Sequence, residues 1–200
     1  MNQLIFTVLT SFNQQFNDLD IGILRTISEG RNPYFDPFFI AVTNSAAAIA
    51  FGVPGIILIA GLIKRNKLMW HRALAVLIPV ALSALMANIL KYIFDTPRPF
   101  EVYPFIEKLS TGGSPSFPSG HTADAFAFAV AALLVARNKI WAVPLLLWAA
   151  LVATSRMWLG VHFPSDVLAG AVIGSLSAFY CMKWFRVNNW FSVTRKQDNA

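Results

Sequence analysis

Charged residues are scarce in this chain, because only 13% of its 200 residues are Asp, Glu, Lys or Arg, whereas 56% are hydrophobic. This composition excludes an ordinary soluble domain and is typical of an integral membrane protein. Cysteine is almost missing as well, since the single Cys181 lies within an apolar run. A disulfide framework and a CxxC site are therefore excluded.

The few charges are unbalanced, with 16 Lys and Arg against 10 Asp and Glu and a net charge of +6. A basic excess can indicate nucleic-acid binding, but the chain lacks a basic stripe interleaved with aromatic residues. Its basic residues cluster between apolar runs, which is the pattern that sets membrane topology. We expect the lipid bilayer as a partner and no nucleic acid. The sequence also lacks an internal repeat, a low-complexity tract and a second domain.

Long apolar runs are what the chain has in place of charge. A hydrocarbon core of about 30 Å needs roughly 20 helical residues, and the sequence offers about five such stretches. They are residues 37–63, 71–94, 119–137, 140–160 and 165–185. The sequence therefore predicts an all-α, polytopic membrane helical bundle. Residues 95–118 form a long loop rich in Pro, Gly and Ser.

The basic residues predict the orientation of these spans. The positive-inside rule assigns ten of the 16 to the cytoplasmic side, namely Lys64, Arg65, Lys67, Arg72, Arg137, Lys139, Lys183, Arg186, Arg195 and Lys196. The amino terminus, the long loop and residues 156–164 then share the outer side. Polar residues far apart in the sequence are expected to meet there.

The first 35 residues are amphipathic. Apolar residues recur there at three- and four-residue steps between polar ones, at Leu4, Ile5, Val8, Leu9, Phe12, Phe16, Leu19, Ile23 and Ile27. This pattern predicts one or two helices lying at the membrane interface rather than a first span. A cleaved signal peptide is not expected, because a basic n-region and a small-residue cleavage site are missing. We expect an interfacial region at 1–35, a membrane domain at 36–187 and a cytoplasmic tail at 188–200.

Ionisable residues at membrane depth are expensive and usually functional. They fall in three segments on the expected outer side: "KYIFDTPRP" with Lys91 and Arg98, "PSGH" with Ser119 and His121, and "SRMWLGVHFPSD" with Arg156, His162 and Asp166. Three cations around one point favour a multiply charged oxyanion, and the planar fork of Arg grips phosphate in a bidentate manner. A phosphate site is therefore predicted.

The chemistry of the other groups fits this site. Pro118 begins a helix, so the backbone N–H groups of Ser119, Gly120 and His121 are expected to face the phosphate. Asp166 follows His162 by one helical turn, which lets the carboxylate orient the ring and leaves the other ring nitrogen as a nucleophile. His121, on another segment, is then available as a general acid.

Together, the three segments resemble the signature of the type 2 phosphatidic acid phosphatase (PAP2) superfamily, whose site is similar to that of vanadium haloperoxidases and bacterial acid phosphatases. That signature is Lys-x6-Arg-Pro, Pro-Ser-Gly-His and Ser-Arg-x5-His-x3-Asp, here beginning at Lys91, Pro118 and Ser155. The resemblance covers about residues 37–185. Many membrane members have six spans, whereas this chain has the amphipathic region in place of the first.

The resemblance implies a PAP2/haloperoxidase-like helical core and a phosphatase mechanism. His162 would form a phosphohistidine, Asp166 would orient it and His121 would protonate the leaving group. The phosphate would be held by Lys91, Arg98, Ser119, Gly120 and Arg156. Water would hydrolyse the phosphoenzyme, with no metal and no cofactor.

Two further residues are candidates for supporting the site. Asp124 lies three residues after His121, where it would tune that imidazole, contact a polar head group or hydrogen-bond a neighbouring helix. Ser155 opens the third motif. Glu101, Glu107 and Lys108 of the long loop either line an entrance or are simply solvated.

The favoured function is hydrolysis of lipid phosphates or diphosphates at the outer face of a bacterial inner membrane. Short length and the lack of an inserted soluble domain resemble bacterial undecaprenyl-diphosphate phosphatases, which favours that substrate. Phosphatidylglycerophosphate, phosphatidate and lipid A phosphate are the rivals. A carrier or flippase for an anionic lipid, and vanadate-dependent peroxidase chemistry, are the alternatives from other classes.

Overall fold

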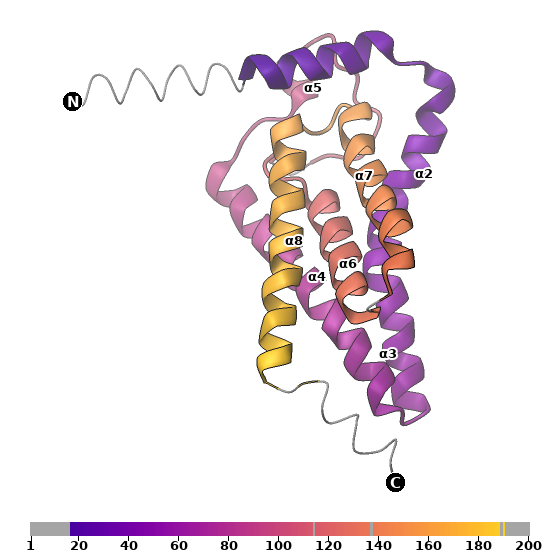
Figure 1. The fold of residues 1–200 in the computed structure, drawn as a ribbon. Helices are drawn as coiled ribbons and strands as arrows, with labels where there is room; N and C mark the ends of the chain where they lie inside the picture. Colours follow the sequence, from indigo (N-terminus) through magenta and orange to yellow (C-terminus); the bar gives the residue numbers. More distant parts are fainter. Residues whose placement is uncertain (1–16, 114, 137, 189, 191–200) are drawn as a thin grey trace, which may run out of the picture.

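The structure is a computed structural model that describes residues 17–113, 115–136, 138–188 and 190. In these residues the regular elements are helices, and none is a strand, so the predicted all-α fold is confirmed (Figure 1). The elements after residue 30 are η1 (Pro33–Phe35), α2 (Asp36–Ala47), η2 (Ala48–Gly52), α3 (Val53–Ile63), α4 (Lys67–Phe94), α5 (Pro99–Val102), α6 (Gly120–Ala136), η3 (Lys139–Trp141), α7 (Ala142–Trp158) and α8 (Pro164–Val187).

Four helical stretches are long and apolar enough to cross a membrane: Pro33–Ile63, Lys67–Val102, Lys139–Trp158 and Pro164–Val187. The fifth predicted span is α6, which is apolar but has only 17 residues. At about 1.5 Å per residue it is about 25 Å long, slightly less than the hydrocarbon core. It packs against α4, α7 and α8 at the centre of the bundle. This short helix is therefore surrounded by its neighbours.

Glycine allows α8 to lie very close to α6. A Cβ atom on Gly170 would stand 2.5 Å from the carbonyl oxygen of Ser119, and one on Gly174 would stand 2.1 Å from that of Ala123. Small residues at such a crossing let two membrane helices bring their backbones together. The first turn of α8 is thereby placed beside the Pro-Ser-Gly-His segment, and the backbone N–H of Ser119 donates to the carbonyl of Asp166 at 3.0 Å.

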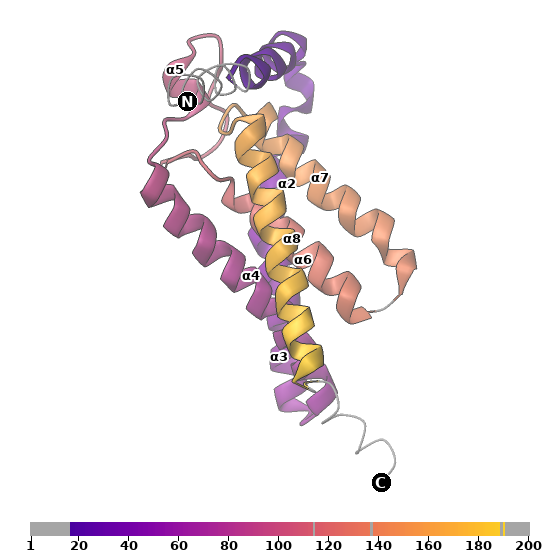
Figure 2. The ribbon, with the colours of Figure 1, turned by 60° about the vertical axis from the view of Figure 1, so that its left-hand side comes forward.

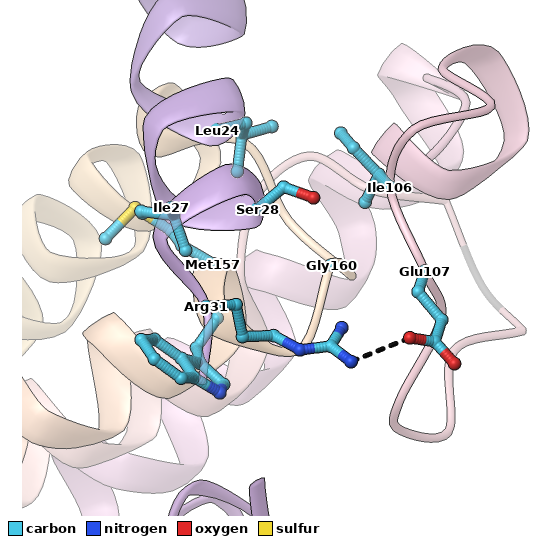
Figure 3. Close-up of a pocket in the computed structure, with 9 residues that line it drawn as sticks. Leu24, Ile27, Ser28, Arg31, Ile106, Glu107, Met157 and Gly160 are labelled. Carbon is cyan, nitrogen blue, oxygen red and sulfur yellow. Dashed lines mark hydrogen bonds and ion pairs between the residues drawn. The ribbon is translucent and has the colours of Figure 1, made fainter. Parts of the chain in front are cut away.

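Residues 17–30 form a helix that lies across the end of the bundle where α7 ends and α8 begins (Figures 1 and 2). Its Leu24 is only 2% exposed. Figure 3 shows this helix facing Ile106 and Glu107 of the long loop across a small pocket. The guanidinium of Arg31 pairs with the Glu107 carboxylate at 2.7 Å.

The predicted interfacial region at 1–35 is thus helical over 17–30, and its place at a membrane interface stays a prediction. Residues 1–16 lie outside the described residues, as do 189 and 191–200 of the predicted tail. The predicted orientation of the bundle likewise stays a prediction.

Candidate active site

Separate helix ends bring the predicted site residues to the end of the bundle under residues 17–30. They come from the last turn of α4, the segment before α5, the start of α6, the last turn of α7 and the α7–α8 turn with the start of α8. Six of the eight residues predicted to be catalytic or to bind phosphate are buried: Lys91, Arg98, Ser119, Arg156, His162 and Asp166. The charges of Arg156, Arg98 and Lys91 all act on His121. The three motifs therefore converge on one place.

His162 and Asp166 form the predicted pair. Nδ1 of His162 lies 3.3 Å from Oδ2 of Asp166, one turn along the chain. The backbone N–H of Phe163 donates to the same carboxylate oxygen at 2.9 Å. With Nδ1 occupied as the donor to a carboxylate, Nε2 is the ring nitrogen that carries the lone pair.

Burial decides the charge of His162. Its side chain is only 2% exposed, and this burial lowers its pKa to about 4, although the hydrogen bond and charge of Asp166 act in the opposite direction. The charges of Arg156 and Arg98 act in the same direction as burial. The imidazole is therefore neutral at neutral pH, which is the form able to attack an electrophile.

Ser116 belongs to this cluster and was missed by the motif analysis. It is fully buried, its hydroxyl donates to Oδ2 of Asp166 at 2.5 Å, and it lies 3.5 Å from Nδ1 of His162. The ammonium of Lys91 donates to the backbone carbonyls of Pro115 and Ser116. The sole sequence signal for Ser116 was its position as a polar residue just ahead of an apolar helix.

Two guanidinium groups are fixed by hydrogen bonds to residues that were not among the predicted site residues. Nη1 of Arg98 donates to the carbonyl of Val161 at 2.7 Å, next to His162. Nη1 of Arg156 donates to the hydroxyl of Thr43 on α2 at 2.5 Å. Nε of Arg156 is buried without a hydrogen-bond partner among the described residues. Because a buried charged donor is costly when unpaired, an anion bound there would supply the missing acceptor. Thr43 lies in an apolar span, where no motif pointed to it.

The start of α6 differs in one respect from the prediction. We expected the backbone N–H of Ser119 to face the phosphate, but it donates to the carbonyl of Asp166 because α8 packs so closely here. The hydroxyl of Ser119 is hydrogen-bonded to that of Thr122 at 2.8 Å. Space remains beside Gly120, where a Cβ atom would meet nothing within 4 Å. The first N–H groups of a helix have no partner within that helix and can bind an anion, which applies here to those of Gly120 and His121.

Asp124 and Ser155 do not reach the cluster by any hydrogen bond within the described residues. The carboxyl of Asp124 is hydrogen-bonded to Ser83 of α4, while its Oδ1 is buried without a partner among those residues. The Ser155 hydroxyl donates to the Val152 carbonyl in its own helix at 2.6 Å. Of the three roles considered for Asp124, the geometry favours the hydrogen bond to a neighbouring helix. In the described residues, no group of three or more His, Cys, Asp or Glu could hold a metal ion.

The family model that matches this chain describes the PAP2 superfamily and covers residues 72–190. The chain belongs to the PAP2 superfamily. Residues 72–190 include all three motifs and more than half of the sequence, so the predicted family is confirmed.

The chain is similar to phosphatases that are named for different lipids. The chain is 26% identical over 174 residues to a lipid A 4′-phosphatase of Bacteroides thetaiotaomicron, covering 82% of this chain and 75% of that protein. It is 32% identical over 99 residues to undecaprenyl-diphosphatase BcrC of Bacillus subtilis, covering 49% of this chain and 50% of that protein. The PAP2 chain is thus an integral membrane protein that groups with lipid phosphatases.

Solved structures show the same fold. A PAP2-type phosphatidylglycerolphosphate phosphatase from Bacillus subtilis is 26% identical with a TM-score of 0.74, covering 92% of this chain and 93% of that one. A bacterial vanadium-dependent chloroperoxidase is 17% identical with a TM-score of 0.59, covering 88% of this chain and 50% of that one. The second likeness concerns the fold alone, and the predicted PAP2/haloperoxidase-like core is confirmed.

Proposed function

We propose that this PAP2 protein hydrolyses a lipid phosphate or diphosphate monoester through a phosphohistidine at His162, on the extracytoplasmic face of a bacterial inner membrane. The observation that carries the proposal is a buried, neutral imidazole oriented by Asp166 beneath a cluster of three cations. Such an arrangement combines an activated nucleophile with fixed positive charge for a phosphoryl group.

The reaction takes place in two displacements. In the first, Nε2 of His162 attacks phosphorus, an N–P bond forms, and the bond from phosphorus to the leaving oxygen breaks as His121 donates a proton to that oxygen. In the second, water attacks phosphorus, His121 takes up the proton from the water, and the N–P bond breaks to release inorganic phosphate. For a diphosphate substrate, the product of the first step is the lipid monophosphate.

The remaining groups stabilise charge during both steps. Arg156, Arg98 and Lys91 surround the phosphoryl oxygens, and the N–H groups of Gly120 and His121 lie at the positive end of α6. Asp166 stabilises the positive charge that His162 acquires when it becomes phosphorylated. Ser116 and Thr43 hold Asp166 and Arg156 in place, so these two hydroxyl groups are positioning residues.

Among substrates we favour undecaprenyl diphosphate. Three cations match the higher charge of a diphosphate, and the BcrC relative is an undecaprenyl-diphosphatase. Lipid A phosphate is the second candidate, because the match to the Bacteroides lipid A 4′-phosphatase extends over 82% of the chain.

A phosphate-release assay tests both parts of the proposal. Purified wild-type protein in detergent is compared on undecaprenyl diphosphate, lipid A, phosphatidylglycerophosphate and phosphatidate, beside His162→Ala and a control, Ser177→Ala. Ser177 is buried in the middle of α8, where its hydroxyl contacts the Met86 sulfur at 3.9 Å. We expect His162→Ala to lose phosphate release almost completely. Release at the wild-type rate by His162→Ala would refute the phosphohistidine, and an anionic-lipid carrier would release none in any form.

A further inference from the structure

Two hollows adjoin the cluster beneath residues 17–30. One has a volume of about 540 Å³ and is lined by Asp166 together with residues of the segment before α5 and of α5. The other has a volume of about 620 Å³ and is lined almost wholly by apolar side chains of residues 19–23 and α8. Asp20, Phe117 and Ser165 line both hollows. The apolar groove and the hollow at the site therefore share one wall.

The groove faces outward along a membrane-spanning helix. Its α8 side includes Leu168 and Val172, which are 64% and 47% exposed, and its other side includes Leu19, which is 56% exposed. Large apolar side chains exposed side by side mark a surface that contacts something apolar. On α8, a membrane span, that neighbour is a hydrocarbon chain.

The helix at 17–30 is tied to the catalytic end of α8. The carboxylate of Asp20 accepts hydrogen bonds from the backbone N–H of Ser165, at 2.9 Å, and from its hydroxyl. Ser165 immediately precedes Asp166. At its other end the helix is fixed to the long loop by Arg31 and Glu107, as Figure 3 shows, and by a hydrogen bond from Ser28 to the Phe105 carbonyl. Both ends of this groove wall are therefore anchored.

We propose that the groove between residues 19–23 and α8 binds the proximal hydrocarbon chain of the substrate, while its phosphate reaches the site through the adjoining hollow at Asp166. This assignment rests on the proposed lipid phosphatase function. Since head group and chain are one molecule, the chain leaves the site across the shared wall at Phe117 and Ser165. A carbon group takes about the volume of a water molecule, roughly 30 Å³, so the groove holds on the order of twenty carbons. The groove therefore has room only for the part of one chain that lies nearest the phosphate.

Filling the groove tests the proposal. Leu168→Trp and Val172→Trp place a large side chain in it without touching the cluster, and Leu147→Trp is the matched control. Leu147, on α7, is also exposed, at 57%, and lines neither hollow. Phosphate release is measured with undecaprenyl diphosphate and with p-nitrophenyl phosphate, which has no chain to place in the groove.

The expected result is a loss confined to the long-chain substrate. Each methylene group of the chain that can no longer be buried in the groove weakens binding about fourfold. If tryptophan displaces two or more methylene groups, kcat/KM for undecaprenyl diphosphate falls by about tenfold or more. Release from p-nitrophenyl phosphate stays at the wild-type rate, and Leu147→Trp behaves as wild type on both substrates.

Two results would overturn the assignment: wild-type kcat/KM for the long-chain substrate in both tryptophan variants, or an equal loss on both substrates. The second result would mean that the groove residues support the fold and do not bind the chain. Failure of the wild-type protein to hydrolyse either substrate is a different outcome, because it refutes the proposed function and the groove assignment together.

Discussion

The substitution Ser116→Ala tests the hydrogen bond that holds the carboxylate of Asp166 beside His162. In the structure this hydroxyl is fully buried and donates to Oδ2 at 2.5 Å. A hydrogen bond to a charged acceptor contributes about 1.5 to 3 kcal/mol. The carboxylate keeps its hydrogen bonds from Phe163 and His162. The substitution therefore removes one hydrogen bond and leaves the His162–Asp166 pair in place.

In the proposed mechanism, this hydrogen bond matters most when His162 carries the phosphoryl group, because the imidazole is then positively charged and Asp166 must be held against it. A loss confined to that state lowers kcat and leaves KM nearly unchanged. Since about 1.4 kcal/mol corresponds to a tenfold change in rate, kcat is expected to fall about ten- to a hundredfold.

The assay is steady-state phosphate release from undecaprenyl diphosphate, with kcat and KM determined separately for the wild type, Ser116→Ala, Ser116→Thr and Ser177→Ala. Threonine keeps a hydroxyl, so we expect it to recover part of the lost kcat, and Ser177→Ala stays near the wild type. A wild-type kcat in Ser116→Ala would refute the positioning role. So would a rise in KM at constant kcat, because that would place Ser116 in substrate binding.

Two further predictions concern pH and helix packing. Burial lowers the pKa of His162 to about 4, so the neutral imidazole that attacks phosphorus persists well below neutral pH. We therefore expect kcat/KM to fall only as the pH drops through about 4. A fall in kcat/KM near the ordinary pKa of histidine would contradict this. Gly170→Ala puts a Cβ atom 2.5 Å from the Ser119 carbonyl oxygen, and overpacking costs about 1 to 3 kcal/mol. We therefore expect a lower thermal unfolding midpoint and reduced phosphate release, whereas Gly22→Ala, with no atom within 4 Å, should be as stable as the wild type.

The parts of this site that the sequence predicted are those with a local pattern. His162 and Asp166 are one helical turn apart, and the Pro-Ser-Gly-His segment opens a helix, so their spacing alone indicates their geometry. The apolar runs predicted the membrane helices for the same reason, because run length matches the thickness of the bilayer.

The parts that were missed depend on contacts across the chain. Ser116 meets Asp166 across 50 residues and Thr43 meets Arg156 across 113, and a single hydroxyl has no periodicity that would reveal either partner. The hydrogen bond from the Ser119 N–H to the Asp166 carbonyl depends on how closely α6 and α8 pack. The spacing of residues along one helix does not predict the distance between two helices.

By itself, then, the sequence determined that this is an all-helical membrane protein of the PAP2 superfamily, because hydrophobic length and fixed motif spacing are properties of single segments. Only the tertiary structure decided which groups hold His162, Asp166 and Arg156 in place, that the Ser119 N–H is used by the Asp166 carbonyl, and that the helix at 17–30 forms one wall of an apolar groove beside the predicted site. Those features depend on side-chain and backbone contacts between helices, which exist only once the bundle has packed.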